Sequence, residues 1–146
     1  MFESKEFINA VIYSNNTSLS DNDFIRAIID KDSFCDLKSV NGDFCGATKR
    51  DGKWILFRDH MGVMPLYYYL KGDKFYFAED IRDLCAIDGV DLSINEKWFY
   101  LDMTGRSTLS LRETEFKYIF AVCPGTWTEF SLDNSSWVIK ENTYWT

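Results

Sequence analysis

The hydrophobic and polar positions along the chain divide it into short strand-like segments and a few helical ones. Residues 6–13 are apolar and rich in β-branched side chains, which predicts a strand. In residues 21–32 the apolar side chains recur at helical spacing on one face, and Ser20 supplies a capping oxygen just before them. The chain is therefore predicted to begin with a strand followed by a helix.

Two hairpins are predicted next, because residues 50–53 and 71–74 each place Asp and Gly between two apolar segments. The flanking strands are residues 41–49, 54–59, 66–70 and 75–78. We expect these four strands to lie beside one another in that order.

The remaining chain shows shorter helical patterns at residues 80–86 and 95–102, and strand character at 118–122, 127–132 and 137–140. Antiparallel hairpins without regular alternation of strand and helix predict an α+β fold of layered sheets. Several strands are apolar on both faces, which fits sheets that are covered on both sides. No linker or repeat is evident, so residues 1–146 are predicted to form a single domain.

Composition and charge narrow the possible partners. The net charge of −7 opposes binding to nucleic acid or anionic lipid, both of which require clustered Lys and Arg. No apolar run reaches the ~18 residues that a membrane span needs, and the first residues lack the pattern of a signal peptide. We predict a cytoplasmic location.

Cysteine and histidine offer little metal chemistry. Cys35, Cys45, Cys85 and Cys123 are far apart and form no C-x-x-C pair, and His60 is the single histidine. The sequence predicts buried free thiols, a solvated loop histidine, and neither a metal site nor a cofactor.

Four motifs in order resemble those of the asparagine synthetase family. They are N-G-D-F-C at residues 41–45, R-D-H-M-G-V-M-P-L-Y-Y at 58–68, F-A-E-D-I-R-D-L at 77–84, and T-E-F continuing to P-G at 114–125. The resemblance covers nearly the whole chain. It implies the family's N-terminal class II glutamine amidotransferase-like domain, an N-terminally shortened αββα sandwich of the Ntn-hydrolase type.

The resemblance also implies which residues support the fold and which formed a substrate site. Gly42, Arg58, Asp59, Gly62 and Pro65 match a motif with a structural role in the family. Arg58 and Asp59 would tie a loop to the sheet through an ion pair or through backbone hydrogen bonds.

A vestigial glutamine site is implied at two further motifs. S-D-N-D at residues 20–23 is similar to the family's S-D-x-E, whose Asp holds the amino group of glutamine. N-A-V-I-Y at residues 9–13 is similar to N-G-E-I-Y, whose Asn and Gly stabilise the oxyanion. Asn9 and Asp21 keep the family's residue types, whereas Ala10 and Val11 replace Gly and Glu.

No catalytic residue is predicted, because glutaminases of this family use an N-terminal cysteine whose own α-amine is the base, and this chain begins with Met1 and Phe2. Neither is there the S-G-G-x-D-S loop of the family's ATP-dependent synthetase domain. The resemblance, also seen with lasso-peptide cyclases and β-lactam synthetases, predicts a domain that is not an enzyme on its own. In active members the activity is glutamine hydrolysis coupled to amide synthesis.

The leading hypothesis is a structural or partner-positioning domain in an asparagine-synthetase-like, ATP-dependent amide-forming system. One alternative is a glutaminase half-site completed by a separate cysteine-bearing chain. Another is a module that binds a small molecule or peptide. An ATP-dependent synthetase domain or protein is the expected partner, and an exposed sheet edge near residue 6 is expected to permit a homodimer.

Overall fold

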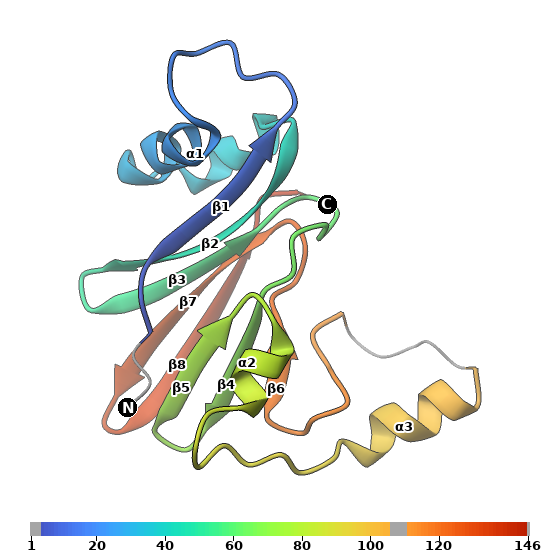
Figure 1. Cartoon of the computed structure of the whole chain (residues 1–146). Coiled ribbons are helices and arrows are strands. Elements are labelled where there is room, and N and C mark those ends of the chain that lie inside the picture. The colour runs from blue at the N-terminus through green and yellow to red at the C-terminus, as the bar shows by residue number, and fades with distance from the viewer. Residues whose placement is uncertain (1–3, 106–110, 146) are drawn as a thin grey trace.

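A computed structural model describes residues 4–105 and 111–145, in which eight strands form two sheets (Figure 1). The larger sheet has the order β1-β2-β3-β7-β8, with β1 Phe7–Ile12, β2 Gly42–Arg50, β3 Lys53–Arg58, β7 Thr126–Asp133 and β8 Ser136–Thr143. The smaller sheet has the order β5-β4-β6, with β4 Tyr67–Lys71, β5 Lys74–Ala78 and β6 Ile119–Ala121. All neighbouring strands are antiparallel, as the sequence predicted.

In the described residues, three α-helices and one 3₁₀ helix accompany the sheets: α1 Asp21–Asp30, η1 Phe34–Ser39, α2 Ile81–Cys85 and α3 Glu96–Met103. Each α-helix begins after a polar residue that caps it. The Ser20 hydroxyl accepts the N–H of Asp23 at 3.2 Å, and the side chains of Asp80 and Asn95 do the same for α2 and α3. None of these helices is long and apolar enough to cross a membrane.

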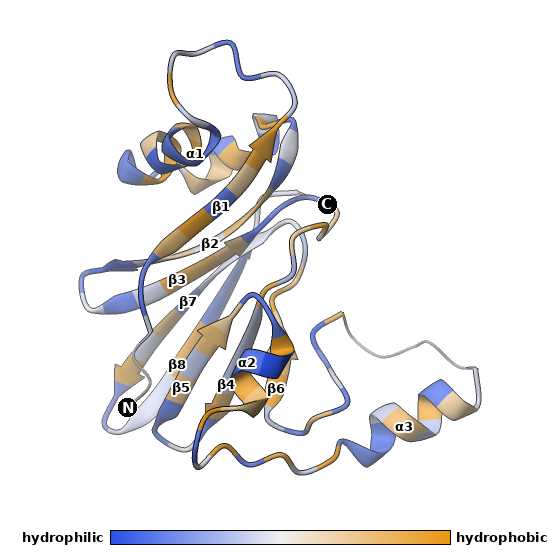
Figure 2. Ribbon diagram, in the orientation of Figure 1, coloured by the Kyte–Doolittle hydropathy of each residue, from blue (hydrophilic) through white to orange (hydrophobic). Residues whose placement is uncertain are grey.

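The apolar side chains form three layers of core, which fixes the order helix, sheet, sheet, helix. One cluster joins α1 and η1 to the outer face of the larger sheet, a second lies between the two sheets, and a third joins α2 to the smaller sheet. Strand β3 serves two of them, because Ile55 and Phe57 face α1 while Leu56 faces the other sheet. Figure 2 shows hydrophobic residues along the strands of both sheets. The expectation of sheets covered on both sides is confirmed.

Both predicted hairpins are present, and their turns explain why. Asp51 and Gly52 have positive φ angles of 51° and 75°, the geometry of a type I′ turn, which matches the twist of paired strands. In the second hairpin Gly72 has φ 59° and closes the turn between β4 and β5.

One predicted neighbour relation is wrong, because β3 and β4 do not pair. The outer edge of β3 pairs with β7, and β4 lies in the other sheet between β5 and β6. The loop of residues 59–66 carries the chain from one sheet to the other, and Gly62 turns it with a φ of 70°. The order of strands depends on β7, which comes some 70 residues later in the sequence than β3.

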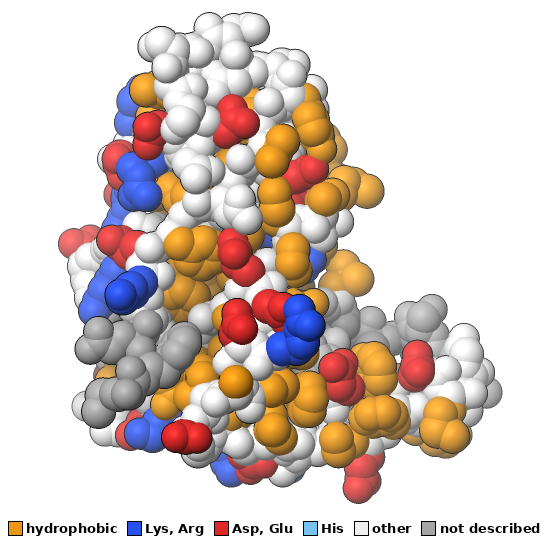
Figure 3. Space-filling view, viewed as in Figure 1, with side chains coloured by type: hydrophobic (Ala, Val, Ile, Leu, Met, Phe, Trp, Pro, Cys, Tyr) orange, Lys and Arg blue, Asp and Glu red, His pale blue; other side chains and the backbone are white. Residues whose placement is uncertain are grey.

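Helix α3 stands away from the sheets (Figure 1), and none of its residues is buried. It is held through the segment before it, where the N–H of Asn95 bonds to the carbonyl of Glu115 at 2.8 Å and the N–H of Lys117 bonds to Ser93 at 2.8 Å. Its side chains Phe99, Tyr100 and Met103 are exposed, and Figure 3 shows hydrophobic atoms on this arm.

Candidate functional site

The two residues implied for a glutamine site lie on neighbouring elements at one edge of the larger sheet. Asn9 is an exposed residue of β1, and Asp21 is the half-buried first residue of α1. Asp21 accepts the backbone N–H of Ile12 at 3.1 Å and the side-chain amide of Asn15 at 2.9 Å. The two hydrogen bonds, that of Asn15 first, hold the pKa of the Asp21 carboxyl below its usual value. Both carboxylate oxygens are thus engaged within the chain.

Asn22, which the sequence analysis did not single out, makes a further contact between α1 and β1. The side-chain oxygen of Asn22 accepts the backbone N–H of Ala10 at 2.9 Å. Asp21 and Asn22, adjacent in the first turn of α1, therefore bond two alternate N–H groups of β1. Only their positions after a helix cap hinted at this role, because side chains in a first helical turn lie near whatever strand the helix packs on.

The loop after β3 is built around the carboxylate of Asp59, which is 1% exposed. It accepts the backbone N–H groups of Val63 and Met64 at 2.9 Å each, of Met61 at 3.1 Å, and of Phe44 at 3.3 Å. The Asp59 carbonyl accepts the N–H of Gly125 at 2.8 Å. One aspartate thus fixes a whole loop and joins it to the start of β7.

Arg58 stabilises the same loop from the other side. Its guanidinium donates to the carbonyls of Met64 at 2.7 Å, Gly62 at 2.7 Å and Val122 at 2.8 Å. Of the two contacts expected for Arg58 and Asp59, an ion pair or backbone hydrogen bonds, the structure shows the second. The two charged residues supply complementary acceptors and donors to the backbone.

The glycines and the proline of the motif lie where the chain passes close to itself. A Cβ on Gly42 would stand 2.4 Å from the carbonyl oxygen of Val11, and one on Gly62 would stand 2.7 Å from the ring of Pro124. The exposed Pro65 lies where the loop enters the smaller sheet, and its carbonyl is 3.7 Å from the sulfur of Cys45. These positions serve packing and leave no room for a larger side chain at either glycine.

His60 differs from the expected solvated loop histidine. Its ring is half-buried and meets the edges of Trp145 and Tyr144, with centroids 4.7 Å and 5.4 Å apart, and its Nε2 lies 3.1 Å from the carbonyl of Lys38. Packing against Tyr144 and Trp145 shields part of the ring from solvent. This arrangement orients the imidazole through packing, with the Lys38 carbonyl as its hydrogen-bond partner.

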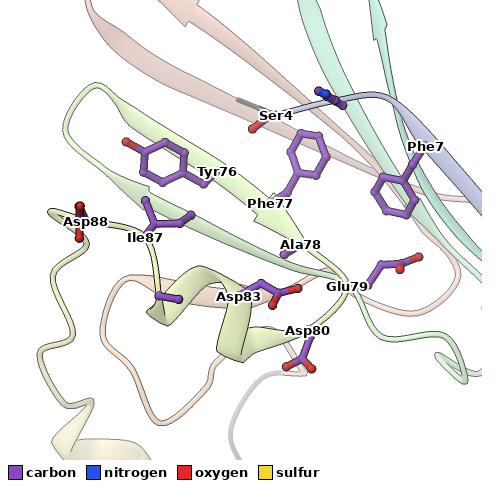
Figure 4. A pocket seen from close by; sticks show the side chains of 12 residues that line it. Ser4, Phe7, Tyr76, Phe77, Ala78, Glu79, Asp80, Asp83, Ile87 and Asp88 are labelled. Carbon is purple, nitrogen blue, oxygen red and sulfur yellow. The ribbon is translucent and has the colours of Figure 1, made fainter. Parts of the chain in front are cut away.

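A cleft of about 870 Å³ lies between the start of β1 and the strand–helix unit of β5 and α2 (Figure 4). Phe7 and Phe77 contribute aromatic surface, and Glu79, Asp80 and Asp83 contribute carboxylates. The Asp80 carboxylate is paired with Arg82 at 2.6 Å, and the hydrogen bonds from Arg82 lower its pKa to about 2. The lining therefore combines aromatic rings with an excess of acidic residues over the single basic one, Lys5.

The comparisons with known proteins agree with the resemblance seen in the sequence. The sequence profile of the glutamine amidotransferase domain matches residues 10–145. The chain belongs to this family. A putative glutamine-hydrolysing asparagine synthetase 2 of Methanocaldococcus jannaschii is 31% identical over 78 residues, which are 52% of this chain and 15% of that protein. The amidotransferase domain described here thus spans a small part of that relative's length.

A solved structure supports the fold. The glutamine phosphoribosylpyrophosphate amidotransferase of B. subtilis, in complex with ADP and GMP, superposes with a TM-score of 0.56 over 95% of this chain and 28% of that one, at 16% identity. At this identity the likeness concerns the fold alone. The α+β architecture with antiparallel sheets is therefore that of an Ntn-type amidotransferase domain.

Burial affects the thiols of this amidotransferase domain to different degrees. Cys45 is fully buried, and burial together with the nearby Glu79 raises its pKa. Burial also raises the pKa of Cys85 and of Cys123, which are half-buried. Cys35 is exposed, so the prediction of four buried thiols is wrong for this residue, which lies at the surface turn of η1.

Two residues from different motifs lie close together in space. Cys45 ends the motif at residues 41–45, and Glu79 lies in the motif at residues 77–84. The sulfur of Cys45 lies 3.7 Å from a carboxylate oxygen of Glu79, so the thiol donates a weak hydrogen bond across the core. Within residues 4–105 and 111–145, no group of three His, Cys, Asp or Glu side chains is placed to hold a metal ion.

Proposed function

We propose that this chain is a non-catalytic amidotransferase domain with a structural or partner-positioning role in an asparagine-synthetase-like, ATP-dependent amide-forming system. The observation that carries the proposal is the corner of β1 and α1, where Asp21 and the N–H of Ala10 are both hydrogen-bonded within the chain.

The chemistry of the family motif explains why this corner matters. Because glycine has no side chain, the donor that the Gly of N-G-E offers an oxyanion is its backbone N–H. Ala10 occupies that position, and its N–H bonds to Asn22 at 2.9 Å. Asp21, at the position that holds the substrate's amino group in the family, bonds instead to Ile12 and Asn15. Glutamine would have to displace three protein groups, those of Asn22, Ile12 and Asn15, to bind as the family motif implies.

The thiols support the same proposal. Glutamine hydrolysis needs a thiolate next to a base, and a raised pKa lowers the thiolate fraction at neutral pH. Cys45, Cys85 and Cys123 all have raised pKa values from burial, and the exposed Cys35 follows α1 at the surface. None of the four lies in a hydrogen bond with His60.

The test is ammonia release from glutamine by the purified chain, measured with a coupled dehydrogenase assay. We expect no turnover above background, with the Cys35→Ser variant as the control for adventitious thiol chemistry. Cysteine-dependent turnover would contradict the proposal. The positioning role is tested by supplying an asparagine-synthetase-like protein of the same genome with ammonia and ATP, and by comparing amide formation with and without this chain. We expect this chain to increase the rate.

A half-site completed by a separate cysteine-bearing chain makes a different prediction. Such a chain would have to release Ala10 N–H and Asp21 from their present partners. Adding an N-terminal cysteine segment of a family glutaminase to this chain would then produce glutaminase activity, and Asn22→Ala, which frees the Ala10 N–H, would raise it. We expect neither effect.

The cleft of about 870 Å³ favours a second candidate function, the binding of a small molecule or peptide. Its volume lies within the usual range of ligand sites. The acidic residues of its lining, Glu79, Asp80, Asp83 and Asp88, outnumber the basic one, Lys5, which favours amines or basic peptides over acidic ones. A thermal-shift comparison of matched basic and acidic peptides tests this candidate, since a ligand that binds only the folded state raises the melting temperature.

A further inference from the structure

The two edge strands of the larger sheet differ in how their outward backbone groups are satisfied. In β1 the N–H of Tyr13 points inward, to the carbonyl of Asn41 at 2.9 Å, so the N–H groups of Ala10 and Ile12 point outward. Those two groups bond to Asn22 and Asp21. Helix α1 thus covers the β1 edge at Ala10 and Ile12.

The opposite edge, β8, has no such cover in the described part of the chain. Asn134 and Ser135 have positive φ angles of 49° and 66°, so the β7–β8 turn is of type I′ and its closing pair, Asp133 and Ser136, shares hydrogen bonds. Hydrogen-bonded pairs alternate along an antiparallel ladder. Val138 and Lys140 therefore bond to β7, while the backbone groups of 137, 139 and 141 point outward.

Strand β8 has few of the usual protections of an edge. It pairs with β7 over its whole length of eight residues without a bulge, and it contains no proline and a single lysine, Lys140. Val138 is 48% exposed and Ile139 is 39% exposed. Long, regular edges with exposed β-branched side chains are templates for pairing with another strand.

We propose that β8 pairs antiparallel with β8 of a second copy, which joins two larger sheets across a twofold axis. In the register that centres on Ile139, this residue lies opposite its own copy, Val138 lies opposite Lys140, and Trp137 lies opposite Glu141. Every outward-pointing residue then meets another outward-pointing residue, as the hydrogen bonds of an antiparallel pair require.

The charges on the strand select this register. Moving the axis by one residue toward the C-terminus places Lys140 directly opposite Lys140 of the second copy, and like charges opposite one another are destabilising. The register centred on Ile139 has no such pair and brings the two isoleucines together. Self-pairing therefore needs no partner of complementary charge.

The net charge of −7 sets how the association depends on salt. Two copies repel each other at long range, and salt screens this repulsion because the Debye length falls from ~30 Å at 0.01 M to ~8 Å at 0.15 M. The contact itself consists of backbone hydrogen bonds and a few apolar side chains. The dimer is therefore weak, concentration-dependent and strengthened by salt.

Sedimentation velocity over a concentration series, at low and at moderate salt, measures this association. Ile139→Pro removes one outward N–H and leaves the β7 ladder intact, because the N–H of residue 139 does not point to β7. We expect it to weaken dimerisation at least about tenfold. Ile139→Val keeps the N–H and the β-branched side chain, and it should change the dissociation constant less than about twofold.

Ile139→Lys is a second variant, in case the proline disturbs the hairpin. It brings two positive charges together at the axis, and we expect the same loss of dimer with an unchanged melting temperature of the monomer. The proposal is overturned if the wild-type chain stays monomeric at ~0.5 mM in moderate salt. It is equally overturned if either variant, correctly folded, dimerises as well as Ile139→Val does.

Discussion

Two aspartates, Asp59 and Asp21, both accept backbone N–H groups, yet their surroundings differ. Asp59 is 1% exposed and accepts four N–H groups from the loop after β3 and from β2. Asp21 is half-buried and accepts one N–H, of Ile12, and one side-chain amide. The carboxylate of Asp59 thus organises a whole loop, whereas that of Asp21 joins a helix to the edge of a strand.

Asp21, which matches the motif implied to bind substrate, makes the same kind of contact with the backbone as Asp59 does. Asp59 lies in the motif implied to be structural, and Asp21 lies in the motif implied to bind substrate. In this chain both carboxylates are bonded to the chain itself. What separates them is burial, which decides the cost of leaving their partners without an acceptor.

Asp59→Ala should have the largest effect. It leaves four N–H groups without their acceptor, and each buried unsatisfied group costs about 1 to 3 kcal/mol, partly relieved by water or rearrangement. We expect the free energy of unfolding to fall by about 3 to 5 kcal/mol, a large part of the total for a domain of this size. Urea unfolding measures it. Asp73→Ala, at an exposed hairpin turn, is the matched control and should change the free energy by less than about 0.5 kcal/mol.

Arg58→Lys should follow. The lysine keeps the positive charge but cannot reach the carbonyls of Gly62, Met64 and Val122 together, because an ammonium lacks the planar fork of the guanidinium. We expect a loss of about 1 to 3 kcal/mol in the same assay. If Arg58→Lys left the free energy of unfolding unchanged, the loop would depend on Asp59 alone. The stabilising role of Arg58 would then be wrong.

Tyr144→Phe tests the link between the loop and the end of the chain. The buried Tyr144 hydroxyl donates to the carbonyl of Arg58, and its ring packs against Phe44 and Trp127. Phenylalanine keeps the packing and leaves one carbonyl unpaired. We expect a loss of about 1 to 2 kcal/mol. Thermal unfolding of both proteins is the measurement, and an unchanged melting temperature would show that water replaces the hydroxyl.

Asp21→Ala should have the smallest effect, roughly a quarter of that of Asp59→Ala or less, because its partners can turn to solvent. Its pH dependence has a definite sign. The folded-state pKa is lowered, so the stabilisation is present above the unfolded value of about 3.9 and is lost as the pH falls through the folded value.

The melting temperatures of wild type and Asp21→Ala, compared between pH 7 and 3, test this sign. The difference should be constant down to about pH 5 and shrink below about pH 4. A difference that grows on acidification would mean that the carboxylate is destabilising when charged. A drop larger than that of Asp59→Ala would reverse the comparison between the two aspartates.

Local signals in the sequence predicted the elements well. The hairpin turns were predictable because Asp51 and Gly52 tolerate positive φ, and α1 was predictable because Ser20 precedes an apolar helical face. The β7–β8 turn was not singled out, since Asn134-Ser135 lacks the glycine that usually marks a type I′ turn.

Long-range relations were less accessible. Nothing near residue 58 indicates that β3 pairs with residues 126–133. The prediction that β3 and β4 are neighbours was therefore wrong. The resemblance placed Asn9 and Asp21 in one site. It could not show that the Asn22 side chain accepts a hydrogen bond from the N–H of Ala10, because this contact depends on how α1 lies along β1. Side-chain exposure, as at Cys35 and His60, likewise depended on the packing of elements distant in the sequence.

The pairing of β3 with β7 has a consequence for how the chain is made. Until residues 126–133 have left the ribosome, the hydrophobic strand Lys53–Arg58 keeps one edge unpaired, and the loop around Asp59 lacks its bond from Gly125. Contacts between residues so far apart in the sequence slow folding, and they prolong the time during which aggregation-prone intermediates are exposed. Residues 126–133 must therefore be synthesised before the larger sheet can be completed.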